Sequence, residues 1–234
     1  ADVLNVCRSV LHGKVPLIVG TGTIDFNKVI AMNEQALAYG ADACLVVTPY
    51  YTKPTQRGLV RFFQPVDDAT PLPLMLYNVP GRTAVDLKPE TVAELAEHPR
   101  IFGIKEATGD LARVAELREL IGDKFMLFSG EDSNALDFTL AGGDGVISVT
   151  SNVAPGRQHD IFAAALAGDV ETARALNEPL NLLHQRLFFQ ANPIPVKWAL
   201  SRMGHIDTGL RLPLTELEPL YHLQPEDALR AARR

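Results

Sequence analysis

The sequence predicts an α/β fold: a (β/α)8 TIM barrel, N-terminally truncated to about six strands, with a C-terminal helical appendage. Three observations predict it. Apolar runs recur through about the first two thirds of the chain, helical segments alternate with them, and only helical segments follow the last run. This βαβα alternation is typical of parallel sheets covered by helices. We expect the partial barrel at residues 1–167 and the helical domain at residues 168–234.

The predicted strands are continuous apolar runs, which indicate burial on both faces of a sheet. They start roughly 20 to 30 residues apart, which leaves room for one helix in each crossover. The six runs cover residues 16–20, 43–51, 73–80, 101–109, 125–130 and 145–152.

The predicted helices of the barrel begin before the first strand and then fill the crossovers. Pro89 suits a first helical turn, and Asp110 suits an N-cap. Glu131 and Asp132 follow a strand, and a loop or N-cap role is expected for them. The helical segments cover residues 3–11, 27–39, 56–68, 89–97, 111–121 and 134–141.

The C-terminal part is predicted to be entirely helical. One long helix should run from residue 170 to 190, and Pro179 should kink it. A stripe of leucines at helical spacing marks its buried face: Leu176, Leu180, Leu183 and Leu187. The other helices are expected at residues 155–167, 195–203 and 225–232.

The strand count leaves two architectures to weigh. A closed barrel needs eight strands, so two βα units are expected to be missing. A doubly wound sheet needs no such units, but its glycine fingerprint is absent, because Gly20-Thr21-Gly22 lacks the third glycine. The barrel is therefore favoured.

The composition excludes several classes of protein. The chain of 234 residues is 47% hydrophobic and carries a net charge of -6 with its charges interspersed, so nucleic acid and anionic membranes are poor partners. Cys7 and Cys44 form no CxxC pair, and the six histidines have no ligand spacing, so no metal site is predicted. Without an apolar stretch of ~20 residues, we expect a soluble, cytoplasmic protein.

Lys105 interrupts the apolar run that begins at Ile101. Removing an ammonium from water is costly, so a lysine at the end of a buried strand tends to become a neutral amine nucleophile. Tyr77 ends the preceding strand, and since the carboxyl ends of parallel barrel strands meet at one mouth, both side chains should lie close together. An amine so placed can form an imine with a ketone, and the neighbouring phenol can move protons during addition and dehydration.

Arg82 follows Tyr77 in the next loop, and its guanidinium suits the bidentate capture of a carboxylate. A keto acid or an aldehyde acid is therefore predicted as substrate. Each residue alone has an ordinary explanation: a strand-end lysine usually reaches solvent, a tyrosine packs at a rim, and a loop arginine is solvated. Their joint placement favours Schiff-base chemistry.

Five motifs closely resemble the 4-hydroxy-tetrahydrodipicolinate synthase (dihydrodipicolinate synthase) family of pyruvate-dependent class I aldolases. The motifs are Val47–Tyr51, Leu76–Thr83, Gly103–Gly109, Gly145–Thr150 and Asn192–Trp198. The resemblance implies a lyase of lysine and diaminopimelate biosynthesis that condenses pyruvate with L-aspartate 4-semialdehyde on Lys105. It implies no metal and no organic cofactor, and a homo-oligomer, usually a tetramer.

The resemblance also implies the remaining site residues. Tyr77 would donate and relay protons, and Tyr51 would cross a dimer interface to complete the relay of a neighbouring subunit. Arg82 would hold the carboxylate of the semialdehyde. The backbone at Ile147 and Gly130 would line the pyruvate pocket.

Two departures from the family pattern lead to further expectations. The family's Thr-Thr-Gly-Glu segment has no counterpart here, so one alternative is a catalytically impaired fragment of the synthase. Another alternative is a different pyruvate-dependent aldolase, such as an N-acetylneuraminate lyase-like or keto-deoxy sugar acid aldolase, although Arg82 favours the synthase. Ile24 and Lys28 stand where lysine-sensitive members place an asparagine and a glutamate, which predicts insensitivity to lysine.

Overall fold

The computed structural model describes residues 2–232, with side chains in the last helix described up to Leu229. The chain divides into two compact units, the first ending at Gly130 and the second beginning at Glu131. The predicted boundary after residue 167 falls inside the second unit, between two helices that pack together. The proposed division into a barrel part and a helical domain stays a prediction.

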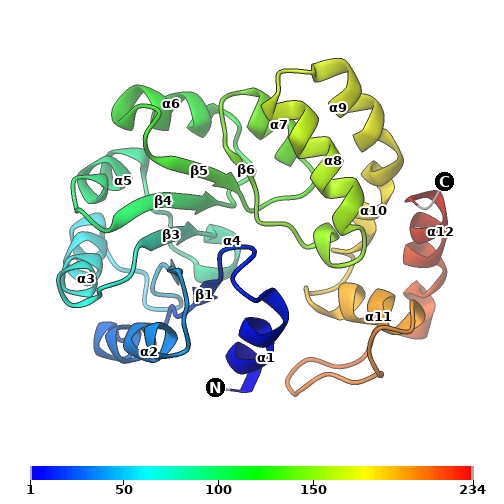
Figure 1. Ribbon diagram of the computed structural model, residues 1–234, viewed down its shortest axis with the longest axis horizontal. Helices are drawn as coiled ribbons and strands as arrows, with labels where there is room; N and C mark the ends of the chain where they lie inside the picture. Colours follow the sequence, from blue (N-terminus) through cyan, green and yellow to red (C-terminus); the bar gives the residue numbers. More distant parts are fainter. Residues whose placement is uncertain (1, 233–234) are drawn as a thin grey trace. The chain divides into compact units, whose positions relative to one another are not determined.

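The first unit is built on a parallel sheet whose strands are hydrogen-bonded in sequence order (Figure 1). Each strand lies within a run that the sequence predicts as a strand, so these predictions are confirmed. The observed strands are shorter than the runs, because the ends of the runs form loops. They are β1 (Ile18–Gly20), β2 (Ala43–Val47), β3 (Leu74–Asn78), β4 (Ile101–Glu106) and β5 (Met126–Ser129).

Helices precede the sheet and fill its crossovers, and four of them, α2, α3, α5 and α6, follow one another along its outer side (Figure 1). Pro89 opens its helix as predicted, but the predicted N-cap at Asp110 is wrong by one residue, because Leu111 stands at the N-cap position of α6, and Asp110 instead accepts the Ala112 amide at 3.0 Å. A short helix after β3 was not predicted. The helices are α1 (Asp2–Leu11), α2 (Phe26–Ala38), α3 (Gln56–Ala69), α4 (Pro80–Thr83), α5 (Pro89–Ala96) and α6 (Ala112–Ile121).

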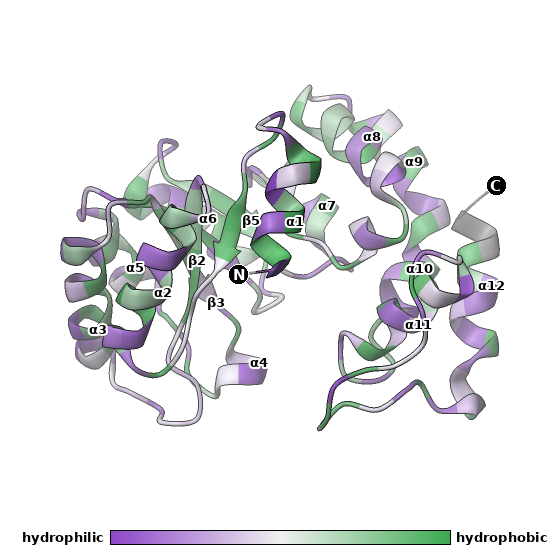
Figure 2. Ribbon diagram, turned by 60° about the horizontal axis from the view of Figure 1, so that its bottom comes forward, coloured by the Kyte–Doolittle hydropathy of each residue, from purple (hydrophilic) through white to green (hydrophobic). Residues whose placement is uncertain are grey.

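The core of the first unit lies between the sheet and these helices. Leu76, Ile104 and Leu127 pair in register across β3, β4 and β5 and are fully buried. Leu59 and Phe63 of α3 are also fully buried. Figure 2 accordingly colours the strands beside the labels β2 and β5 as hydrophobic. Burial of each of these side chains stabilises the folded state by roughly 1.5–3 kcal/mol.

Between residues 131 and 232, the second unit contains one short strand, and helices and loops make up the rest. Its buried core includes three members of the leucine stripe, Leu180, Leu183 and Leu187, and Leu176 packs against them, so the predicted stripe is confirmed. The elements are α7 (Ala135–Leu140), β6 (Gly145–Val146), η1 (Thr150–Asn152), α8 (Pro155–Leu166), α9 (Val170–Asn177), η2 (Glu178–Leu180), α10 (Asn181–Arg186), α11 (Ile194–Arg202), η3 (Pro219–Tyr221) and α12 (Leu223–Ala232).

The prediction of one helix from residue 170 to 190 is wrong in two respects. A 3-10 turn at Glu178–Leu180 separates α9 from α10, and α10 ends at Arg186. Proline lacks a backbone N–H and clashes with the preceding turn, so the interruption falls at Pro179, where a kink was expected. None of the helices between residues 2 and 232 is long and apolar enough to cross a membrane.

Candidate active site

One row of side chains crosses the sheet of the first unit near its carboxyl edge. Val47 pairs with Tyr77, Tyr77 with Lys105, and Lys105 with Phe128. Residues in register on parallel strands point to the same face, so Lys105 lies between two aromatic residues. The predicted proximity of Lys105 and Tyr77 is confirmed.

The lysine contacts the face of the tyrosine ring. Lys105 Nζ lies 4.3 Å from the centroid of the Tyr77 ring. At such a distance, the electron-rich face of the ring attracts the positive charge of an ammonium group. Both residues are half-buried, so Lys105 is less enclosed than the apolar run before it suggested. Part of the lysine side chain is therefore exposed, while its alkyl chain packs beside Gly130.

Gly130, at the end of β5, provides the space beside that alkyl chain. A Cβ atom added to Gly130 would lie 2.7 Å from Ala107 Cβ and 2.9 Å from Lys105 Cε. Real Cβ atoms essentially never come closer than 3.0 Å. The Gly130 amide also donates to the Glu106 carbonyl oxygen at 2.7 Å. Only glycine fits here without displacing the lysine.

A polar cluster on the opposite face of the sheet was missed by the sequence reasoning. Asn78 and Glu106 pair in register one residue beyond Tyr77 and Lys105, so their side chains point the other way. Asn78 Nδ2 donates to Glu106 Oε2 at 3.0 Å and to Asp86 Oδ1 at 2.9 Å. Arg113 of α6 binds both carboxylates. The signal was present in the sequence as an amide and an acid at the ends of buried strands.

Glu106 is held by donors on every side. The pKa of this carboxyl group is raised above its ordinary value, because burial outweighs the hydrogen bond from Asn78, the charge of Arg113 and the hydrogen bonds from Thr108, which all lower it. The Thr108 amide donates to Oε1 at 2.8 Å and Arg113 Nη1 donates to Oε2 at 3.3 Å. A carboxylate surrounded only by donors is best satisfied when ionised. We therefore treat Glu106 as an anion paired with Arg113.

Arg82 lies on α4, directly after β3, and is exposed. The helix ends at Thr83 and is capped by Ala84, which has a positive φ of 60°. The Thr83 hydroxyl shares its proton between the carbonyl oxygens of Val79 and Val85, at 3.1 and 3.0 Å. This local bonding gives the loop a defined course. It presents a guanidinium near the end of the strand that carries Tyr77.

Tyr51, like Arg82, is an exposed member of the predicted site. Its side chain is 88% exposed, and its backbone has a φ of 72°, which is unusual for an aromatic residue. The Tyr51 amide donates to the Thr83 carbonyl oxygen at 3.1 Å, so the backbone is anchored to the loop that carries Arg82. The ring is thus exposed, while the backbone that carries it is held by a hydrogen bond.

Ile147 belongs to the second unit, where it precedes a tightly bonded turn. The Asp132 carboxylate accepts the Val149 amide at 2.8 Å, the Thr150 amide at 3.2 Å and the Ser148 hydroxyl. Asp132 therefore holds the start of η1, in agreement with the loop or cap role expected for it. Thr150 in turn bonds the buried ring of His184, with Oγ1 2.9 Å from Nδ1.

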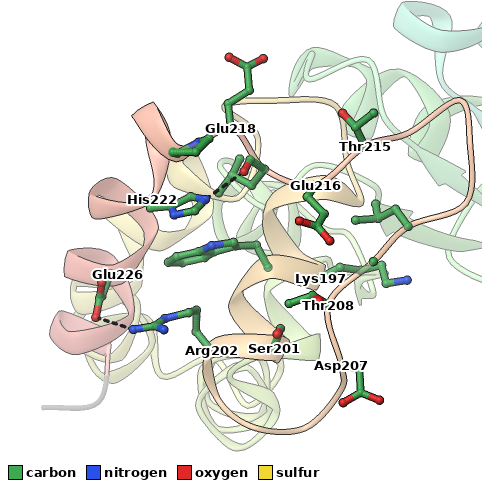
Figure 3. Close-up of a pocket in the computed structure, with 15 residues that line it drawn as sticks. Lys197, Ser201, Arg202, Asp207, Thr208, Thr215, Glu216, Glu218, His222 and Glu226 are labelled. Atoms are coloured by element: carbon green, nitrogen blue, oxygen red, sulfur yellow. Dashed lines mark hydrogen bonds and ion pairs between the residues drawn. The ribbon is translucent and has the colours of Figure 1, made fainter.

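The second unit also contains a cavity of about 800 Å³ between α11, the loop after it and α12 (Figure 3). The Trp198 and His222 rings contact each other in it at a tilt of 35°, with centroids 5.1 Å apart, and Arg202 pairs with Glu226 at 3.6 Å. None of the predicted site residues lines this cavity. The ring contact and the ion pair both join residues that line the cavity. The cavity therefore has no part in the imine chemistry that Lys105 suggests.

The family of the chain follows from a comparison with known proteins. The model of the dihydrodipicolinate synthetase family matches residues 1–232. The chain belongs to this family. A 4-hydroxy-tetrahydrodipicolinate synthase of Alcanivorax borkumensis is 56% identical over 216 residues, which are 92% of this chain and 74% of the relative. The synthase of Pseudomonas aeruginosa is 51% identical over 220 residues, 94% of this chain and 75% of the relative.

The solved structures agree with this family. The dihydrodipicolinate synthase of Acinetobacter baumannii, crystallised with pyruvate, has a TM-score of 0.97 and 46% identity, and the match covers 99% of this chain and 80% of that chain. The resemblance, the TIM-barrel class and the assignment to the 4-hydroxy-tetrahydrodipicolinate synthase type of lyase are thereby confirmed. The alternative functions are not favoured. The roles of individual residues stay predictions.

Proposed function

We propose that the protein joins pyruvate to L-aspartate 4-semialdehyde through an imine on Lys105 and releases 4-hydroxy-tetrahydrodipicolinate. The observation that carries this proposal is the Tyr77–Lys105 pair, with Nζ 4.3 Å from the ring centroid. Imine chemistry needs an amine that a ketone can reach and a neighbouring group that moves protons. The relative from Acinetobacter baumannii, which was crystallised with pyruvate, supports the choice of keto acid.

The reaction begins with attack of the Lys105 amine on the ketone carbon of pyruvate. The oxygen of the resulting carbinolamine takes up a proton from Tyr77 and leaves as water, which forms the imine. Tyr77, left as a phenolate, takes up a methyl proton, which gives an enamine. The enamine carbon attacks the aldehyde of the second substrate, and Tyr77 returns the proton to the oxygen of that aldehyde. The amine of that substrate then adds to the imine carbon, closes the ring and displaces Lys105.

The other predicted residues bind the substrates or complete the proton path. Arg82, whose loop is fixed by Thr83, holds the carboxylate of the semialdehyde through a two-pronged contact. The backbone at Gly130 and Ile147 lines the pyruvate pocket. Tyr51 reaches the relay of a second copy, which its exposed ring on an anchored backbone supports.

No metal and no organic cofactor takes part in this proposal, because the protonated imine itself withdraws electrons from the reacting carbon. We further propose a homo-oligomer, a dimer or a tetramer, that works in the cytoplasm. The scarcity of cysteine supports a reducing compartment. Neither a nucleic acid nor a membrane is needed as partner.

A substrate panel tests the proposal. The protein should consume aspartate semialdehyde with pyruvate and should leave uncharged aldehydes and sugar aldehydes nearly unused. Arg82→Ala should raise the KM for the semialdehyde by about tenfold or more, since it removes a charge-assisted contact. Arg61→Ala, which changes an exposed arginine of α3, is the matched control. Equal use of uncharged aldehydes would contradict the proposal.

A further inference from the structure

The polar cluster behind the Tyr77–Lys105 row has no part in the chemistry proposed above. It joins four residues of the first unit: Asn78 at the end of β3, Glu106 at the end of β4, Asp86 in the loop before α5, and Arg113 on α6. Glu106 is only 2% exposed and Asn78 is fully buried. Burying so much polarity is costly unless every group is paired. The contacts of the cluster show what it holds in place.

Arg113 is the centre of the cluster. Its Nη1 donates to Glu106 Oε2 at 3.3 Å and to the Leu87 carbonyl oxygen at 3.0 Å, and its Nη2 donates to Asp86. The side chain is 11% exposed. One planar guanidinium therefore joins the end of β4 to two successive residues of the loop that follows α4. The ammonium of a lysine has no such fork and could not keep all three contacts.

The loop that Arg113 holds follows directly after α4, the short helix that carries Arg82. Asp86 and Leu87 follow Arg82 by four and five residues. Asn78 binds the same segment from β3, because its Oδ1 accepts the Leu87 amide at 3.0 Å. At the other end of the loop, Thr83 accepts the Tyr51 amide. These bonds connect the backbone that follows Arg82 to the ends of both β3 and β4.

Glu106 connects this loop to the nucleophile. It is the next residue after Lys105, and its backbone carbonyl accepts the amide of Gly130, the residue packed against the Lys105 side chain. Its carboxylate receives Arg113, Asn78 and the Thr108 amide. Loss of the charge at Glu106 would leave Arg113 with Asp86 as its one ionic partner and would weaken the link between the loop and the end of β4, while Asn78 still bonds the loop to β3.

We propose that Arg113 and Glu106 are positioning residues for capture of the second substrate. Together they fix the Arg82 loop to the end of the strand that carries Lys105, and they thereby set how well the carboxylate of the aldehyde acid is held beside the imine. This inference rests on the roles proposed for Arg82 and Lys105. Neither Arg113 nor Glu106 contacts the substrates.

The test uses Arg113→Lys and Glu106→Gln in the whole protein, with Asp86→Asn as a milder variant because Asp86 is 37% exposed. We expect the KM for aspartate semialdehyde to rise between about tenfold and about a hundredfold, as displaced positioning groups do. Trapping of pyruvate on Lys105 by borohydride should change by no more than about twofold, since the row on the other face keeps its register. Asp86→Asn should change the same KM in the same direction by less.

Asp67→Asn is the matched control. Asp67 is also a buried carboxylate, but it accepts the Arg100 amide at 3.1 Å, at the amino end of β4. It should lower the unfolding midpoint without changing the KM for the semialdehyde. An unchanged KM in all three cluster variants would overturn the inference, as would a parallel loss of pyruvate trapping and semialdehyde affinity. No trapping in the unaltered protein would overturn the proposed function and this inference with it.

Discussion

Replacing Gly130 with alanine should move the Lys105 side chain out of its place. The new Cβ atom would lie 2.7 Å from Ala107 Cβ, 2.9 Å from Lys105 Cε and 3.2 Å from Lys105 Cγ. The flexible lysine chain must move to relieve its own contact, and because Ala107 Cβ is fixed to the backbone, the contact with Ala107 is relieved only by a backbone shift. Overpacking of this kind costs about 1–3 kcal/mol of stability. A displacement of the amine on the order of 1 Å lowers the rate by about a hundredfold.

Two measurements separate these effects. Urea unfolding gives the loss of stability, and the rate at which borohydride traps pyruvate on the protein gives the loss of amine reactivity. Gly143→Ala is a control for overpacking, because its Cβ would lie 2.4 Å from Phe138 Cδ1 in the second unit. Gly156→Ala is a control for the methyl group itself, since nothing lies within 4 Å of its Cβ.

The expected pattern is specific. Gly130→Ala should be slow in trapping, Gly143→Ala should be destabilised with an unchanged trapping rate per folded molecule, and Gly156→Ala should match the unaltered protein. A Gly130→Ala variant that traps pyruvate at the original rate would refute the packing of Gly130 against Lys105.

Three further changes test other parts of the account. Tyr77→Phe keeps the ring under Lys105 and removes the hydroxyl, so kcat should fall by about a hundredfold or more in steady-state assays while the unfolding midpoint stays close to the original; an unchanged kcat would exclude Tyr77 as the proton relay. Burial lowers the pKa of His184, a shift that the charge of Asp132 partly opposes. The unfolded chain therefore binds a proton at this residue more readily, and the free energy of unfolding should fall as the pH drops below about 6.5. His184→Gln should reduce that pH dependence in urea titrations, and an identical dependence would assign it to other groups. Millimolar lysine should leave turnover unchanged, because Ile24 cannot hydrogen-bond an effector and Lys28 would repel its ammonium; strong inhibition would contradict this.

The sequence was sufficient to predict features that repeat along the chain. Apolar runs at regular intervals predicted β1 to β5 and the start of β6, and the spacing of Tyr77 and Lys105 by one βα unit predicted that they meet. Both predictions depend only on the period of the fold and on the alternation of side chains along a strand.

The polar cluster could not be predicted in the same way. Its members come from β3, β4, α6 and a loop, and their contacts depend on the register of two strands and on the course of the loop after α4. Buried strand positions are expected to be apolar, so the periodicity of the sequence gives no reason to pair Glu106 with Arg113. The short helix α4 was missed because four residues carry no period to detect.

The identity of the lysine that forms the imine is the central claim, and one measurement tests it directly. The protein is incubated with pyruvate, reduced with borohydride and digested, and the modified peptide is identified by mass spectrometry. We predict one reduced pyruvate, attached to Lys105, and no adduct in Lys105→Arg. An adduct on another lysine, or equal labelling of Lys105→Arg, would contradict the account.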